Sequence, residues 1–264
     1  GAVTDSRQVQ KDYLFIPIKG ARVDGHDFIP QVFEKGALVV LSDHALPEET
    51  GPYILVSSTT EAMKKIAAFY RTQLSCKVVG ITGSVGKTST KEMIASVLEQ
   101  RYKVLKTEGN FNNEIGLPLT IFKIRAKHEV AVLEMGISDF GEMHRLAAMA
   151  RPDIGVITNI GLCHLENLGT RDGILQAKTE MFDHLQIDGT VILNGDDDKL
   201  SSKKEVNGKP VIFYGVGADS AFDIKKDIYA TDIENHGLEG MRAKIHTPQG
   251  DFDAKIPIPG EHNV

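Results

Sequence analysis

The chain has 264 residues, of which 41% are hydrophobic and 25% are charged, a composition typical of a globular protein with one large or two smaller domains. No run approaches the roughly 18 apolar residues that a membrane span needs, and the N-terminus does not have the pattern of a signal peptide. The net charge of -6 argues against a large nucleic-acid-binding surface. Cys76 and Cys163 do not have metal-binding spacing, so we predict reduced thiols.

Residues 1–74 predict a small α/β domain. Short β-type segments are separated by turn-rich stretches, and the last segment has the apolar spacing of a helix. The predicted strands are Tyr13–Ile18, Leu38–Leu41 and Tyr53–Val56, and the predicted helices are Phe28–Lys35 and Thr60–Thr72.

From residue 75 to 264 the pattern changes to strands alternating with helices, which predicts a mainly parallel sheet covered by helices on both faces. The predicted strands are Lys77–Thr82, Lys103–Lys106, Glu129–Leu133, Ile154–Thr158 and Thr190–Leu193, and two of the helices are Lys87–Gln100 and Arg171–Leu185. After Pro210, the β-type segments Val211–Tyr214, Ala243–His246 and Phe252–Ile256 predict an antiparallel extension. The first residue is not Met and the last residues read as the start of a helix, so we expect that both ends are truncated.

A glycine-rich loop follows the first strand of this second region and opens a helix. The run Gly80–Thr88 reads GITGSVGKT, which is the context of a phosphate-binding loop. Backbone N–H groups and the helix N-terminus favour phosphate, Lys87 would reach the β- and γ-phosphates, and the Thr88 hydroxyl would bind Mg²⁺. Ile81 occupies the place of the first glycine of the strict motif. The alternative is a glycine-rich turn beside an exposed lysine.

Polar residues follow each predicted strand at the edge of the sheet where the phosphate loop lies. Ligands of open parallel sheets bind beyond the carboxyl ends of the strands. Taken singly these residues would be turn formers, but their convergence favours a functional site. They are Thr107–Asn113, Glu134–Gly136, Asn159, His164 and Asn194–Asp197.

Glu134 and His164 are two further candidate metal ligands from the residues alone. Glu134 ends an apolar strand, where a carboxylate is costly unless it is paired or bound to metal. A salt bridge is the alternative for Glu134. His164 is either a ligand, a group that supports one, or a structural loop residue.

Lys178 lies on the apolar stripe of its predicted helix, four residues after Ile174. A buried lysine near a metal site would have a depressed pKa and a nucleophilic amine. Such an amine can react with CO₂ to form a carbamate, which would be an oxygen ligand for Mg²⁺. The alternative is a lysine whose aliphatic stem packs inside while its ammonium reaches water.

Several of these runs resemble the Mur ligase family. The resemblance rests on Ile81–Ser89, Thr107–Thr120, Glu134–Gly136, and His164–Glu166 with Ala177-Lys178 downstream. Thr4–Arg7 and Asp24–Phe28 resemble the family domain that holds the UDP end of the substrate. The match covers nearly the whole chain and implies an N-terminal substrate domain over residues 1–74 and a central ATP-binding domain over 75–264.

The resemblance implies a cytoplasmic, monomeric ATP-dependent ligase that joins D-Ala-D-Ala to UDP-MurNAc-tripeptide in peptidoglycan precursor synthesis. ATP would phosphorylate the peptide carboxylate, and the amine would attack the acyl phosphate. The implied catalytic residues are Lys87, Glu134, His164 and Lys178. ATP would be bound by Thr82, Gly83, Ser84, Val85, Gly86, Lys87, Thr88, Ser89 and Asn263. Two Mg²⁺ ions would be held by Thr88, Glu134, His164 and carbamylated Lys178. The UDP-linked substrate would contact Ser6, Arg7, Asp24, Gly25, His26, Asn110, Asn112 and Asn113.

Three alternatives stay open within this resemblance. One is the diaminopimelate- or lysine-adding ligase, which has a threonine-rich loop where this chain has Asn110–Gly116. The second is a cyanophycin- or folate-type ligase, and the folate type lacks the UDP-binding domain. The third is a non-catalytic nucleotide-binding relative. Family members continue into a third, Rossmann-like domain that is absent here, so we expect weak nucleotide binding and no ligation by these residues alone.

Overall fold

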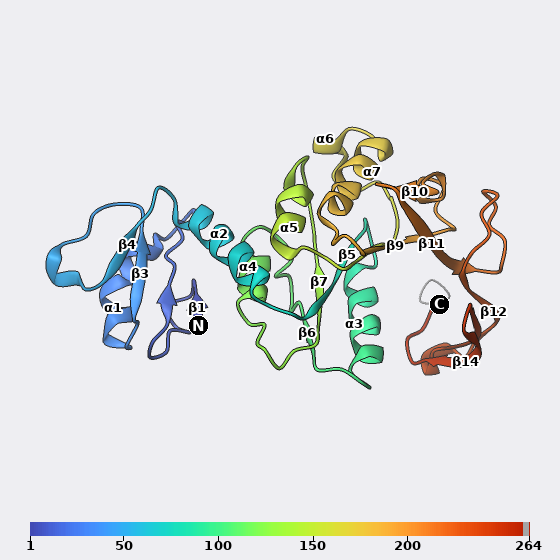
Figure 1. The fold of residues 1–264 in the computed structure, drawn as a ribbon, viewed down its shortest axis with the longest axis horizontal. Coiled ribbons are helices and arrows are strands. Elements are labelled where there is room, and N and C mark those ends of the chain that lie inside the picture. Colours follow the sequence, from blue (N-terminus) through green and yellow to red (C-terminus); the bar gives the residue numbers. More distant parts are fainter. Residues whose placement is uncertain (261–263) are drawn as a thin grey trace.

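The computed structural model describes residues 1–260 and residue 264, and it confirms an α/β protein built on two sheets (Figure 1). The first sheet has four parallel strands in the order β1-β2-β3-β4. None of the helices among the described residues is both long and apolar enough to cross a membrane. The elements of this first part are β1 (Ala2–Val3), β2 (Leu14–Phe15), η1 (Gly25–Phe28), α1 (Ile29–Glu34), β3 (Val39–Ser42), η2 (Glu48–Thr50), β4 (Tyr53–Leu55) and α2 (Thr59–Thr72).

Helix α2 connects the two sheets, as Figure 1 shows. It begins after Ser58, whose hydroxyl accepts a hydrogen bond from the N–H of Glu61, the expected N-cap contact. Met63 and Ala67 lie four residues apart on its buried face and belong to a core cluster that includes residues of both sheets. The two parts of the chain therefore share one apolar core along α2.

The second sheet has ten strands, nine of which follow the order β14-β13-β12-β11-β9-β8-β5-β7-β6, while β10 pairs only with β11. All strands from β11 to β6 in this order run parallel. The elements from β5 to η3 are β5 (Lys77–Thr82), α3 (Lys87–Leu98), β6 (Val104–Lys106), α4 (Gly116–Ile121), β7 (Val130–Glu134), α5 (Glu142–Ala150), β8 (Ile154–Ile157), α6 (Leu165–Leu168), α7 (Arg171–Thr179) and η3 (Glu180–His184). The remaining elements are β9 (Thr190–Asn194), η4 (Leu200–Ser202), β10 (Glu205–Val206), β11 (Lys209–Val216), β12 (Ile228–Asn235), η5 (Gly237–Glu239), β13 (Met241–Thr247) and β14 (Gly250–Ile256).

Alternate residues of the central strands fill two separate core clusters, one on each face of the sheet. Val79 and Ile81 of β5 pack with Ala95 of α3, whereas Val78 belongs to the larger cluster that contains residues of α2, α4, α5 and α7. This alternation follows from the period of two along a strand. The parallel sheet is buried on both faces, as predicted, and its loops meet at one edge.

Three details of the prediction were wrong. The helix predicted over Arg171–Leu185 is α-helical only to Thr179 and continues as the 3₁₀ helix η3, because the Thr179 hydroxyl bonds back to the carbonyl groups of Leu175 and Gln176. Strand β11 is parallel to both β9 and β12, so the antiparallel extension begins only at β13. Strand β12 (Ile228–Asn235) was not predicted.

Candidate active site

The predicted phosphate loop forms residues 83–86, between β5 and the first turn of α3. Two of its glycines are required by the geometry. Gly86 caps α3 with a φ of 80°, which is unfavourable for residues with a side chain. A Cβ atom on Gly83 would lie 1.9 Å from the Thr158 hydroxyl oxygen. The loop can therefore curl tightly only with glycine at both positions.

The loop is fixed against the carboxyl end of β8 by five hydrogen bonds, one of which joins the N–H of Ser84 to the carbonyl of Asn159 at 3.0 Å. The carbonyl of Val85 accepts from the Thr158 hydroxyl at 2.7 Å and from Asn159 Nδ2 at 3.0 Å. The N–H of Val85 donates to Asn159 Oδ1, and the Ser84 hydroxyl accepts from the N–H of Gly161. Such contacts preorganise the loop. Sequence reasoning did not assign this role to Thr158, although its place at the end of a strand beside the loop was a signal for it.

Lys87, the first residue of α3, lies over this loop. Its Nζ donates to the carbonyl of Gly83 at 2.9 Å and to that of Ser84 at 3.4 Å. The free N–H groups of the first helical turn and the lysine charge together form an arrangement that binds anions. The geometry of Lys87 is therefore suited to a phosphate group.

Glu134 ends β7 beside the start of α3, and its side chain is almost fully buried. Its carboxylate accepts hydrogen bonds from the Thr88 hydroxyl at 2.9 Å and from Asn112 Nδ2 at 2.8 Å. Its backbone N–H donates to the Thr107 hydroxyl. The structure thus brings together three of the predicted residues at this edge of the sheet: Thr88 in the first turn of α3, Asn112 in the loop after β6, and Glu134 at the end of β7.

Lys91 is a member of this cluster that sequence reasoning missed. Its side chain is buried, and its Nζ donates to the carbonyl of Thr107 at 2.7 Å and lies 3.9 Å from Glu134 Oε2. Glu92 pairs with it on the outer side. Lys91 lies one helical turn after Lys87, so the helical period was a signal that it points toward the same edge.

Lys178 is buried on α7, with 1% of its surface exposed. Burial is the main reason that the pKa of its amine falls from 10.5 to about 8; Cys163 acts in the opposite direction, and the charge of Lys87 adds to the lowering. The His164 side chain is half-buried, and within residues 1–260 no hydrogen bond or ion pair joins it to Glu134 or Lys178.

The predicted substrate residues near the N-terminus lie in the turn after β1 and at the start of η1. Figure 1 shows this first part of the chain away from α3, where the phosphate loop ends. Ser6 is buried, and its carbonyl accepts from Lys35, whereas the exposed Arg7 guanidinium pairs with Asp5. Asp24 accepts hydrogen bonds from both the backbone and the ring of His26. Gly25 lies so close to Ile18 that a Cβ atom would approach its nitrogen to 2.6 Å.

A cavity of about 460 Å³ opens between the first sheet and the loop that contains Asn110. Asn110 itself is exposed, and the Asn113 side chain accepts from the N–H groups of Ile115 and Gly116, so it fixes the start of α4. Asn263 lies outside the described residues. Residues of both parts of the chain form the cavity wall, including Gln8, Tyr13, Glu108, Phe111, Lys123 and Arg125.

Comparison with known proteins places this geometry in a family. Residues 81–264 match the model of the Mur ligase middle domain, and residues 1–71 match that of the Mur ligase family, catalytic domain. The chain belongs to the Mur ligase family. The middle-domain match begins within β5, immediately before the phosphate loop.

Individual Mur ligases are similar along the whole chain. The UDP-N-acetylmuramoyl-tripeptide–D-alanyl-D-alanine ligase of Bacillus subtilis is 42% identical, with 100% of this chain and 56% of the relative covered. A crystal structure of MurF from Acinetobacter baumannii matches 99% of this chain and 56% of its own at a TM-score of 0.89 and 34% identity. MurF of Thermotoga maritima, solved in complex with ADP, matches 99% of this chain and 59% of its own at a TM-score of 0.86 and 30% identity. The chain thus spans a little over half the length of these relatives.

Proposed function

We propose that this chain is the UDP-substrate- and ATP-binding part of a Mur ligase that joins D-Ala-D-Ala to UDP-MurNAc-tripeptide. The observation that carries the proposal is the buried Glu134 carboxylate, held beside Thr88 and the phosphate loop. The Bacillus subtilis relative, 42% identical over the whole chain, is named for this activity. We place the boundary between substrate and ATP domains near residue 74, between α2 and β5, and we expect a cytoplasmic monomer.

The residues around Glu134 fit a Mg²⁺ ion. The Thr88 hydroxyl and the Glu134 carboxylate are 2.9 Å apart, and hard oxygen ligands of this kind suit Mg²⁺. When bound, the metal would offset negative charge that develops on the transferred phosphoryl group. Lys178 fits as a further ligand only after carbamylation, which its depressed pKa favours because the neutral amine is the form that attacks CO₂. His164 would support a second ion.

The protein contributes mainly position and charge to this proposed reaction. Lys87 and the N–H groups of the loop hold the phosphates of ATP. The γ-phosphorus forms a bond to the peptide carboxylate oxygen as its bond to the β-phosphate oxygen breaks. The amine of D-Ala-D-Ala then forms the amide bond, and inorganic phosphate leaves. The cavity with Lys123 and Arg125 in its wall lies where an anionic UDP-linked substrate could extend from the first sheet toward the loop.

Nucleotide binding tests the first half of the proposal. The chain is titrated with ADP and Mg²⁺, and Lys87→Ala is expected to weaken binding about 10-fold or more, since it removes a charge-assisted contact. Lys65→Ala is the matched control, because Lys65 is an exposed lysine on α2. Equal affinities of the Lys87 variant and the unaltered chain would contradict the assignment of the loop.

Substrate choice tests the second half. ADP release by the intact gene product that carries this sequence is measured with UDP-MurNAc-tripeptide and D-Ala-D-Ala, and separately with the dipeptide precursor and diaminopimelate or lysine. We expect release only in the first assay. Release only in the second would identify a diaminopimelate- or lysine-adding ligase, and ADP binding without release in either would identify a non-catalytic relative.

A further inference from the structure

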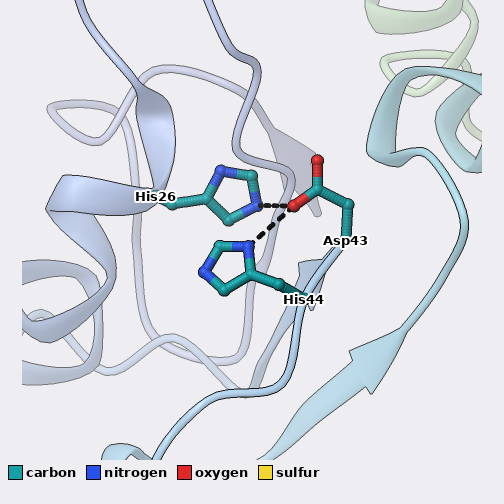
Figure 2. Close-up of side chains that lie close together, drawn as sticks. All are labelled: His26, Asp43 and His44. Carbon is teal, nitrogen blue, oxygen red and sulfur yellow. Dashed lines mark hydrogen bonds and ion pairs between the residues drawn. The ribbon is translucent and has the colours of Figure 1, made fainter.

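His26, Asp43 and His44 form a cluster on the first sheet, separate from the ATP site. Figure 2 shows both imidazole rings directed at the same carboxylate oxygen of Asp43. His44 Nδ1 lies 2.8 Å from this oxygen and His26 Nε2 lies 3.4 Å from it. One nitrogen or oxygen atom of each residue lies within 4.8 Å of the others. The cluster lies just beyond the carboxyl end of β3, at the edge where open parallel sheets bind ligands.

The ring of His26 is buried and has one nitrogen without a hydrogen-bond partner. Its Nδ1 lies 2.7 Å from Asp24 Oδ1, and since a carboxylate can only accept, Nδ1 carries the proton. The Nε2 of a neutral ring then presents a lone pair toward the Asp43 oxygen, which also has no proton to offer. Among the described residues, Nε2 is one of two buried side-chain nitrogen or oxygen atoms without a hydrogen-bond partner. Two acceptors facing one another at 3.4 Å lack the group that would satisfy both.

We propose that His26, Asp43 and His44 bind a divalent cation of the zinc type, with a fourth position open to solvent. Two imidazole nitrogens and one carboxylate oxygen are a ligand set that suits zinc and disfavours magnesium. Tetrahedral zinc with bonds near 2.0 Å separates its ligand atoms by about 3.3 Å, close to the 3.4 Å between His26 Nε2 and Asp43 Oδ1. The proposal does not rest on the ligase activity proposed above, and it assigns a metal to His26, which the family resemblance places among the UDP-substrate contacts.

The surrounding chain holds these ligands in place. Asp24 orients His26 as a carboxylate orients many metal-bound histidines. The hydroxyl of Ser42 bonds to both the N–H and the carbonyl of His44, which fixes the backbone at the end of β3. The His44 ring is 57% exposed, so it can transfer its proton from Nδ1 to the outward Nε2 and move by the fraction of an ångström that coordination needs.

The test uses the tag-free chain, stripped of metal with a chelator and titrated with Zn²⁺ in excess Mg²⁺, so that oxygen-rich sites stay occupied by Mg²⁺. Co²⁺ replaces Zn²⁺ in a parallel titration, where intense visible absorption reports tetrahedral coordination. We expect one equivalent to bind at this site. His44→Ala and Asp43→Asn are expected to weaken binding by at least about 10-fold, and Asp24→Asn by about 10-fold to 100-fold, the range for residues that orient a ligand.

His236→Ala is the matched control, because His236 also pairs with a carboxylate, Glu234, at 3.0 Å. It should bind Zn²⁺ as the unaltered chain does. Absence of binding by the unaltered chain, or equal binding by His44→Ala, would overturn the proposal. Circular dichroism checks that each variant folds. If Asp43→Asn does not fold, His44→Ala decides the result, because its ring is mostly exposed.

Discussion

Replacing Lys178 by Met should stabilise the chain at neutral pH. Lys178 is buried on α7, and no residue among those described forms a hydrogen bond or ion pair with its Nζ. Met has nearly the same length and fills the same space without a charge. The substitution therefore removes an unfavourable buried charge while it keeps the packing against the core.

The size of the effect follows from the pKa. The amine titrates near 10.5 in the unfolded chain and at about 8 in the folded one. Each unit of difference between the two pKa values is worth about 1.4 kcal/mol, so the charged Lys178 costs the folded state about 3 kcal/mol at pH 7. Between pH 8 and 10.5 the unfolded chain holds more protons than the folded chain, so the stability of the unaltered protein rises with pH. The advantage of Lys178→Met must shrink over the same interval.

Urea unfolding followed by circular dichroism measures this difference, since the chain has no Trp for fluorescence. The buffer is depleted of CO₂, so that the amine stays free. Lys65→Met, at an exposed position of α2, is the control and should change the unfolding free energy little at any pH. A Lys178→Met variant that is less stable than the unaltered chain at pH 7, or whose advantage does not change up to pH 10.5, would refute the reasoning.

Three further substitutions test the frame of the site by the same unfolding measurement. Gly83→Ala should lower the unfolding free energy by about 1–3 kcal/mol, because the added Cβ would lie 1.9 Å from the Thr158 hydroxyl oxygen. The variant should also bind ADP more weakly, and an unchanged unfolding free energy together with an unchanged ADP affinity would contradict this. Asp153→Ala should lower the unfolding free energy by about 1–3 kcal/mol, because the buried Arg71 guanidinium, 3.5 Å from the Asp153 carboxylate, would lose this partner. Asp153→Asn should lower the unfolding free energy less. Lys91→Met should lower the unfolding free energy by about 1–3 kcal/mol, because the buried Glu134 carboxylate would lose its nearest cation. Lys91→Arg, which keeps the charge, is the control.

The central parallel strands and the phosphate loop could be predicted because their signals are local. β5 is an apolar run with β-type residues, and the glycines of the loop follow it directly. The convergence of Thr88 and Glu134 also followed from one rule, that parallel strands deliver their carboxyl ends to the same edge. The same rule brings the loop that contains Asn112 to this edge, where the Asn112 side chain donates a hydrogen bond to Glu134.

Other features depend on contacts between distant parts of the chain and could not be predicted. Lys91 is one of several lysines on α3 and β6, and only its packing against Thr107 and Glu134 buries it. Strand β11 runs parallel to β9, and residues 195–208 form the crossover between them. This crossover contains no α-helix, so the usual helical signal of a parallel connection is missing from the sequence. The facing of His26 and Asp43 joins two loops whose sequences have no metal-binding spacing.

Positive charge gathers around the phosphate loop in the free protein. Lys87 lies over the loop, and its charge contributes to the low pKa of Lys178, while Lys91 is offset by Glu134 and Glu92. A bound polyphosphate would compensate Lys87 and favour the charged form of Lys178. Because a ligand stabilises the state it binds in proportion to its affinity, ADP should raise the unfolding free energy of the unaltered chain more than that of Lys178→Met. Equal increases in the two proteins would show that the charge of Lys178 does not interact with the nucleotide.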